Sequence, residues 1–484
     1  MEYLPGILIL SLFLLASVGI LYCYKQEDYR KALWLILGLA LSLRVFLSLE
    51  PLIHKWDERY HALVAKHLVQ HPLIPSLYDD PPLEADFKDW GRTELWISKQ
   101  TLPLWLMAGS IAIFGDGEFA LRIPSILLAL LSVYLSFIVG KELFGIKVGL
   151  IAAYLHAIHG LFLELSAGII SSDHVELFHQ LSLQGGIIAA VFYLKYTREK
   201  YLYLLAFCMA AAFLSKWISA LMILFVFSGL LLAQKRDFKM LVKSLFKITG
   251  IFLLLIGPWM SYLLLNFPEE TSWMLSNVLF PIYEAEGGHQ GSIFYYLDEI
   301  RIIFGELIYL PLIYLSIRNL RWKKRSSQQI ILLWIWIPLI LLSIADMKRH
   351  TYILVSAPAF FILLAFFFRF FSLYAHRFQR KKWLLQLLAI LLLVLPIRYS
   401  LERLKPFKHR WERPQWQKEM ADFVNSLEIP EEKIILSSEP HHLEAMYYYE
   451  VYAYEYELKA DQIKFLQENG FQVFKKEEDG YRKY

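Results

Sequence analysis

The chain has 484 residues, of which 57% belong to the hydrophobic class and only 19% are charged, and its mean hydropathy is +0.41. A soluble globular protein carries more charge and fewer apolar residues, so this composition excludes that class. The net charge is only +4, and the two cysteines, Cys23 and Cys208, lie inside apolar runs without disulfide or metal-site spacing. The sequence predicts an all-α polytopic membrane protein with membrane lipids, and no nucleic acid, among its partners.

Apolar runs long enough to cross a bilayer recur along the chain, and we count about twelve. They lie at about 4–24, 32–50, 119–140, 147–166, 174–195, 201–214, 217–233, 243–265, 303–319, 328–345, 351–371 and 383–399. The first run lacks a basic segment and a small-residue cleavage site, so we interpret it as a retained span. A further apolar segment at 101–114 contains Pro103 and Gly109, and it is expected to form a re-entrant or surface helix.

The loops between these spans alternate in charge. One set is dense in Lys and Arg, which predicts the cytoplasmic side by the positive-inside rule. These loops lie at 25–31, 141–147, 195–200, 235–239, 318–325 and 377–382. The other loops, together with both ends of the sequence, are expected on the extracytoplasmic face.

The stretch 56–68 follows the second span and carries Asp57 and Glu58 side by side. Apolar and aromatic residues, including Tyr60 and Leu63, repeat at helical spacing, which predicts a short helix on the membrane surface. Both carboxylates would lie in its first turn, at the positive end of the helix dipole. Adjacent carboxylates at the mouth of a span are costly unless they serve a function, although Asp57 alone could also be a helix cap.

Five further polar features share the predicted outer face. They are the loop 71–100 with Lys99, the segment 171–174 with Asp173, Lys216, the loop 283–289 with Glu284, Glu286 and His289, and the segment 346–350 followed by Tyr352. The carboxylates could deprotonate a hydroxyl or hold a metal. The cationic and histidine side chains could bind a phosphate: they are Lys99, Lys216, Lys348, Arg349 and His350. This combination suits group transfer from a lipid-linked phosphate, whose departing charge the cations would stabilise.

Each of these residues also has a plainer interpretation. Lys216 at a helix end could extend its charge toward the headgroups without binding a ligand. Asp173 could cap the span that begins at His174. His289 could be a solvated loop histidine. Only their shared face favours the functional interpretation.

Short motifs in this chain follow one another in a specific order. They are Asp57-Glu58-x-Tyr60, 99–106, 118–125, 171–173, 213–216, 288–297 and Lys348 with 352–354. Their order resembles the family 39 glycosyltransferases and their aminoarabinose-transferase relatives, which are GT-C fold enzymes that include the protein O-mannosyltransferases. The resemblance covers roughly residues 45–365.

The resemblance implies an inverting, extracytoplasmic transferase in a bacterial inner or plasma membrane, with a polyprenyl-phosphate-linked sugar as donor. Asp57 would be the catalytic carboxylate, with Glu58 and Asp173 as further acids. The implied substrate- and phosphate-binding residues are Lys99, Lys216, His289, Lys348, Arg349, His350 and Tyr352. Whether a divalent metal takes part stays open, and its candidate ligands are Asp57, Asp173 and His289. The family's Glu before Lys99 is Ser98 here, and the acceptor is a protein, a lipid or a surface glycan.

Residues 1–400 are expected to form the GT-C-like transferase domain, with 51–118 as its first extracytoplasmic loop. The remaining residues, 401–484, are no longer apolar and predict a small soluble α/β domain on the same face. We expect strands at 433–438, 451–457 and 471–474, and a helix at 461–469 that Gly470 ends.

Two other functions remain open. A secondary transporter would place ionisable groups and broken helices near the bilayer midplane in two related halves, whereas these charges gather at one face. A polymerase or ligase of lipid-linked glycans would share the donor chemistry but not these motifs.

Overall fold

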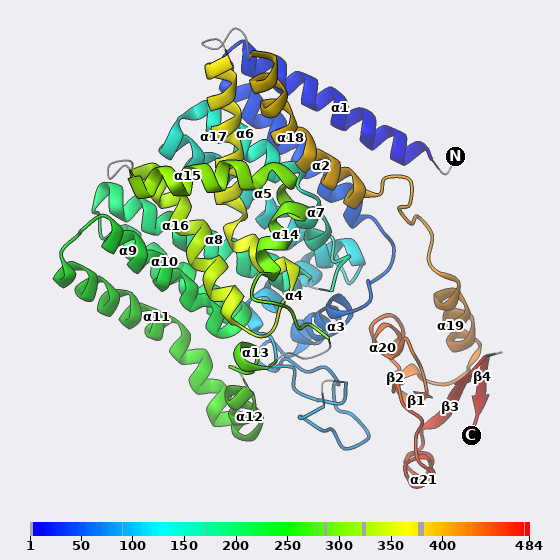
Figure 1. Cartoon of the computed structure of the whole chain (residues 1–484). Helices are drawn as coiled ribbons and strands as arrows, with labels where there is room; N and C mark the ends of the chain where they lie inside the picture. The colour runs from blue at the N-terminus through cyan, green and yellow to red at the C-terminus, as the bar shows by residue number, and fades with distance from the viewer. Residues whose placement is uncertain are drawn as a thin grey trace.

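The structure is a computed structural model, and it describes every residue except 1–2, 90, 172, 278, 285–287, 322–325, 376–381 and 479. Long apolar helices form a bundle, and a small sheet lies beside one end of it (Figure 1). The predicted residues Ser172 and Glu286, and parts of the basic loops at 318–325 and 377–382, lie outside the described residues.

The apolar runs form the helices of the bundle. These are α1 Leu4–Lys25, α2 Tyr29–Ser48, α5 Glu118–Phe144, α6 Ile146–Ile158, α7 Gly160–Ser166, α8 His174–Tyr196, α9 Lys200–Lys216, α10 Met222–Ala233, α11 Phe238–Asn266, α15 Tyr309–Arg321, α16 Ser326–Ile344, α17 Ala357–Ala375 and α18 Lys382–Leu404. Shorter elements connect them: α3 Asp57–Gln70, α4 Thr101–Phe114, η1 Trp217–Leu221, α12 Pro268–Asn277, α13 Phe280–Tyr283, α14 Tyr295–Phe304, η2 Glu306–Ile308 and η3 His350–Ser356.

In the described part of the chain, nine helical stretches are long and apolar enough to cross a membrane. The number is eleven if each of two bent helix pairs counts as one span. The first pair is α6 with α7, bent by 55°, and the second is α14 with the helix that follows it, bent by 117°. The chain is therefore the polytopic helical membrane protein that the composition predicts.

One of the nine stretches, 200–233, contains a reversal of the chain. Lys216 at the end of α9 pairs with Glu176 at the start of α8, whereas Arg236, just after α10, donates to the carbonyl of Leu194 near the other end of α8 (3.0 Å). Helices α9 and α10 therefore run in opposite directions, and the chain turns at Trp217, whose φ is +52°. Counting this stretch as two passes brings the largest number to the twelve expected from the sequence.

Local sequence explains how several helices begin and pack. Asp28, Asp173 and Asp237 cap α2, α8 and α11 by accepting a hydrogen bond from a backbone N–H in the first turn. Helices α5 and α6 approach so closely that a Cβ on Gly140 would lie 2.9 Å from the Cα of Gly149. Small residues at such crossings let membrane helices come together.

The tail forms three helices and a four-stranded sheet with the order β2-β1-β3-β4. Its elements are α19 Gln415–Ser426, η5 Glu431–Lys433, β1 Ile434–Ser437, α20 His442–Tyr449, β2 Tyr452–Ala453, α21 Ala460–Glu468, β3 Gln472–Glu477 and β4 Gly480–Lys483. Strand β1 is parallel to β2 and β3, and β4 is antiparallel to β3. The expected strands and helix are present, although β2 is much shorter than predicted, and α19, α20 and β4 were not predicted.

Helix α20 of the tail covers α3, and the two lie side by side in Figure 1. Lys66 of α3 donates from Nζ to the carbonyl of Tyr447 at 2.8 Å, and the Tyr448 hydroxyl accepts from the backbone N–H of Ile53 at 2.9 Å. Apolar residues of α3, α4 and the tail share one buried cluster. The prediction that α3 lies on the membrane surface is therefore wrong, because its apolar face packs against protein.

Candidate functional site

Glu58 holds the first turn of α3. Its carboxylate accepts two hydrogen bonds from Arg122 of α5, from Nε to Oε1 at 2.8 Å and from Nη2 to Oε2 at 3.1 Å. The Nε2 atom of His174 lies 3.0 Å from Oε1, and the backbone N–H of His54 donates to Oε2 at 2.6 Å. The Glu58 and Arg122 side chains are both fully buried. This carboxylate is thus engaged by three partners.

The same contacts keep Glu58 ionised. Burial raises the pKa of a carboxyl group, but the charge of Arg122, then that of His54, and the hydrogen bonds from His174 and Arg122 hold the pKa of Glu58 below its usual range. Arg122 also donates to backbone carbonyls just before α3, including that of Leu52 at 2.6 Å. A buried carboxylate with a lowered pKa and occupied acceptors is a poor base, so Glu58 fixes the start of α3.

Asp173 holds the second turn of α3 through a histidine. Its Oδ2 lies 2.6 Å from Nδ1 of His61, and its Oδ1 accepts from the backbone N–H of Val175 at 3.1 Å, which caps α8. The side chains of His61 and Asp173 are each 1% exposed. Burial raises the pKa of Asp173. The charge of His61 and the hydrogen bond between the two side chains lower it by more, so the pKa of Asp173 lies below its usual range. The capping role considered from the sequence is therefore real, and it coexists with a bond to α3.

These contacts tie α3 to the ends of α5 and α8. We name the five residues that make them the α3 lock: Glu58, His61, Arg122, Asp173 and His174.

Asp57 is the first residue of α3 and is half-buried. The N-cap position is occupied by Trp56, with φ +74°, and no side chain caps the helix. Asp57 is therefore not the helix cap considered from the sequence. Its carboxylate makes no hydrogen bond or ion pair with any other described residue. Of the three predicted catalytic acids, Asp57 is the one without a partner in that part of the chain.

A second polar group gathers where α9 ends and η3 begins. The Lys216 ammonium pairs with Glu176 of α8 and lies 4.2 Å from the ring centroid of Tyr352. The buried Nε of Arg349 and the buried Nε2 of His350 have no hydrogen-bond partner among the described residues. We name Lys216, Arg349, His350, Glu176 and Tyr352 the basic corner. It has one carboxylate for two permanent cations, so N–H donors remain for an anionic ligand.

Lys348 directly precedes Arg349 of the basic corner in the sequence, but its ammonium has a different set of partners. Its ammonium donates to the carbonyls of Leu342 at 3.3 Å, Ser343 at 2.9 Å, and Ala345, which are the last residues of α16 and the one after it. These are the carbonyls that a helix leaves unpaired, so Lys348 caps α16. The backbone N–H of Lys348 donates to the carbonyl of His289 at 2.8 Å, which places that histidine beside this segment.

Lys99 lies on a segment held between two tryptophans. The indole of Trp217 donates to the carbonyl of Ser98 at 3.2 Å, and the indole of Trp259 donates to Oε1 of Gln100 at the same distance. Lys99 is half-buried, and its ammonium makes no hydrogen bond or ion pair with another described residue. Since Trp217 directly follows the last residue of α9, Lys99 is anchored near the basic corner.

The candidate metal ligands do not gather. Among the described residues, no group of three or more His, Cys, Asp and Glu side chains is arranged to hold a metal ion. Asp173 is bonded to His61 and Val175, whereas His289 lies beside Lys348.

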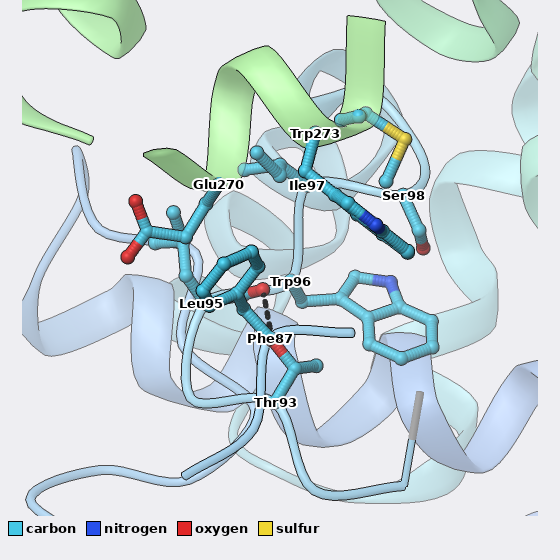
Figure 2. Close-up of a pocket in the computed structure, with 9 residues that line it drawn as sticks. Phe87, Thr93, Leu95, Trp96, Ile97, Ser98, Glu270 and Trp273 are labelled. Atoms are coloured by element: carbon cyan, nitrogen blue, oxygen red, sulfur yellow. Dashed lines mark hydrogen bonds between the residues drawn. The ribbon is translucent and has the colours of Figure 1, made fainter. Parts of the chain in front are cut away.

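A small pocket lies between the 87–98 segment and α12. In Figure 2, the rings of Phe87, Trp96 and Trp273 surround it, and the carboxylate of Glu270 points away from these rings. Trp96 stacks on Tyr60 of α3, with ring centroids 4.9 Å apart. The aromatic wall of this pocket therefore rests directly on the helix that begins with Asp57.

Sequence reasoning missed the partners of the predicted residues. These are His61, Arg122, His174 and Glu176. Two of them carried a signal: His61 is four residues after Asp57 and so shares its helix face, and Glu176 is an acid inside an apolar span.

The sequence model of the dolichyl-phosphate-mannose-protein mannosyltransferase family matches residues 99–262. This range begins at Lys99 and includes Asp173 and Lys216, but it does not reach α3. No curated protein matches the sequence.

Solved structures match nearly the whole chain. The chain resembles ArnT from Cupriavidus metallidurans bound to undecaprenyl phosphate, with 12% identity, a TM-score of 0.64, and coverage of 91% of this chain and 92% of that one. The apo state of the same protein matches with 14% identity, a TM-score of 0.65, and coverage of 92% of this chain and 93% of that one. It also resembles the oligosaccharyltransferase AglB from Archaeoglobus fulgidus in complex with an inhibitory peptide and a dolichol-phosphate, with 11% identity, a TM-score of 0.59, and coverage of 93% and 70%.

These likenesses confirm the predicted fold: the chain has the GT-C fold of ArnT, followed by a small four-stranded α/β unit. The family match and the fold together support the class predicted from the motifs, a membrane glycosyltransferase of the GT-C type.

Proposed function

We propose that this protein transfers a sugar from a polyprenyl-phosphate donor to a hydroxyl group of a protein, a lipid or a surface glycan. The observation that carries this proposal is the contrast between Asp57, a carboxylate without a described partner, and the basic corner, which has unused N–H donors. A transferase needs a proton acceptor for the incoming hydroxyl and positive charge for the leaving phosphate, and both are present here.

In the proposed reaction, Asp57 accepts the proton of the acceptor hydroxyl as its oxygen attacks the anomeric carbon of the donor sugar. The bond between that carbon and the phosphate oxygen breaks, and the polyprenyl phosphate leaves with the bonding electrons. Lys216 and Arg349 stabilise the charge on the departing phosphate, and Lys99 assists from the segment that Trp217 holds beside the end of α9. A single displacement of this kind inverts the anomeric configuration.

In this proposal, Glu58 and Asp173 hold α3 in place and do not contact the substrate. Both are buried and bonded within the α3 lock, so neither is available to a substrate. They hold α3 so that Asp57, at its first position, points to the acceptor. Lys348 supports the site by capping α16 and holding the His289 loop against the start of η3.

The ligands bound in two solved structures that this chain resembles agree with this donor class. The ArnT structure contains undecaprenyl phosphate and the AglB structure contains a dolichol-phosphate. Both ligands are polyprenyl phosphates, which is the product that the proposed reaction releases.

We further propose that the site faces the extracytoplasmic side of a bacterial inner membrane. The basic loops at 25–31, 141–147, 195–200 and 235–239 adjoin the ends of α2, α5, α8 and α10 that lie away from α3, which supports a cytoplasmic position for them. Residues 1–400 then form the transferase domain, and 401–484 form an extracytoplasmic domain that covers α3. Single cysteines at Lys235 and Glu428 test this arrangement: a membrane-impermeant reagent should label only the second from outside intact cells, and the reverse pattern would overturn it.

Radiolabelled polyprenyl-phosphate sugar tests the function directly. Purified protein in lipid vesicles, given this donor and a membrane extract, should move label into a protein, lipid or glycan fraction with release of polyprenyl phosphate. A transporter would instead carry intact labelled donor or solute across the vesicle membrane. A polymerase or ligase would require a preassembled lipid-linked glycan. Either of these outcomes, without single-sugar transfer, would refute the proposal.

A further inference from the structure

His61 is buried at the centre of the α3 lock, and although it lies within the predicted helix 56–68, no role is predicted for it from the sequence. It lies one helical turn after Asp57, on the same face of α3. Its Nδ1 is 2.6 Å from Oδ2 of Asp173, and an ionised carboxylate can only accept, so Nδ1 carries the hydrogen. This bond joins two residues that are 112 positions apart in the sequence.

The His61 bond and the Glu58 bonds act on successive turns of α3. Glu58 fixes the first turn to Arg122 of α5. His61 fixes the second turn to Asp173, which is itself held by its hydrogen bond to the start of α8. With one polar attachment, the rotation of α3 near Asp57 would depend on apolar packing and on contacts farther along the helix, whereas two attachments on successive turns fix both position and rotation there. The direction of the Asp57 side chain depends on that rotation.

Packing holds the rest of the imidazole. The Trp96 ring lies edge-on to it, with centroids 6.1 Å apart, and Trp96 stacks in turn on Tyr60. The other ring nitrogen of His61, Nε2, is buried and has no hydrogen-bond partner among the described residues. The bond from Nδ1 is therefore the polar contact through which this side chain is oriented in the described structure.

We propose that His61 is a positioning residue, which sets the rotation of α3 through its Nδ1–H bond to Asp173 and thereby aims the Asp57 carboxylate at the acceptor hydroxyl. The inference rests on the proposed transfer reaction. It assigns to Asp173 an indirect role, exerted through His61, and it makes the identity of residue 61 a determinant of the turnover rate.

Three substitutions of His61 separate this role from others. Asparagine places an amide N–H near the position of Nδ1, glutamine places one near Nε2, and leucine provides neither. We expect His61→Leu to lower kcat on the order of 10²-fold, the loss that a misplacement of about 1 Å can cause, with little change in KM for the donor. His61→Asn should recover most of that loss, and His61→Gln should not.

His61→Leu leaves the Asp173 carboxylate buried without its partner, so this variant can fail to fold. The double variant His61→Leu/Asp173→Asn removes that charge and keeps an oxygen to cap α8. It should melt close to the parent temperature and still turn over slowly, which is the signature of lost positioning.

The inference is overturned if His61→Leu keeps the parental kcat, or if His61→Asn is as slow as His61→Leu while His61→Gln is active. The second result would assign the chemistry to Nε2. If the parent itself transfers no sugar, the proposed function fails, and melting then decides whether the bond orders α3. Equal melting temperatures for the Asn and Leu variants would refute the bond as well.

Discussion

The α3 lock and the basic corner are both polar groups inside an apolar bundle, but they use their charges differently. In the lock, Glu58 and Arg122 are fully buried and make multidentate contacts with one another and with backbone. In the basic corner, the Lys216 side chain is 21% exposed and Arg349 keeps an unpaired Nε. Charged groups that pair with one another fix a structure, whereas charged groups that keep unused hydrogen-bond donors can bind a ligand. Asp57 belongs with the second kind.

The largest effect is expected where the comparison predicts a free carboxylate. Asp57→Asn removes the proposed base, so transfer should fall by roughly 10²–10⁴-fold. Folding should be unaffected, because this carboxylate has no partner among the described residues and Trp56 occupies the N-cap. Initial rates with labelled donor test the expected loss of transfer, and thermal melting in detergent tests whether folding is unaffected. A folded variant with a near-parental rate would remove Asp57 from the mechanism.

Lys216 tests the basic corner. Lys216→Met keeps the apolar stem and removes the charge, so donor use should fall by ~10²-fold or more. The change also leaves Glu176 buried without its partner. The double variant Lys216→Met/Glu176→Gln relieves that charge and should melt more like the parent while remaining slow. If the double variant regains parental donor use, Lys216 serves only to neutralise Glu176.

Glu58 tests the lock through stability. Glu58→Gln leaves Arg122 buried without a counter-charge, and breaking such a pair costs about 3–5 kcal/mol. Chemical denaturation of the purified protein measures this loss. The matched control is Glu402→Gln, which breaks an ion pair with Arg398 whose side chains are 60% and 66% exposed, and which should cost far less stability. Equal losses for the two variants would contradict the structural role of Glu58.

The smallest effect is expected at Lys348. Its ammonium is directed to the end of α16, so Lys348→Met should lose about 0.3–1 kcal/mol of stability and change transfer only a few-fold. Parallel rate measurements on Lys216→Met provide the scale. A loss at Lys348 as large as that at Lys216 would restore the phosphate-binding role that the sequence predicted for it.

The fold was predicted well from the sequence because each membrane span can be recognised from its own consecutive residues. Twenty consecutive apolar residues either cross a bilayer or fill a core, and the bounds of α8 agree with the predicted span 174–195 to within one residue. The turn at Trp217 was also foreseen, because Lys216 interrupts an otherwise apolar stretch. The tail was harder, since α20 begins and ends within a polar context that reads as a loop.

The site was only partly predictable because pairing is not local. The residues of the Glu58–Arg122 bond are 64 positions apart, and the bond from Lys66 to Tyr447 spans 381. A sequence shows that acids and bases share a face of the membrane, but it does not show which of them are paired. For that reason Asp57 and Glu58 are both predicted as catalytic acids, with Asp57 preferred, and only the structure separates the carboxylate without a described partner from the paired one.

The tyrosine contacts between α20 and the start of α3 have a consequence for how the protein matures. The Tyr448 hydroxyl and the Tyr447 carbonyl bond to Ile53 and Lys66, so residues near the end of the chain complete the surroundings of residues near its beginning. A ribosome delivers α20 after the helices of the bundle, which can insert into the membrane before it appears. The activity proposed above is therefore expected to appear only once α20 has been synthesised and has folded against α3, so that biosynthesis itself delays its onset.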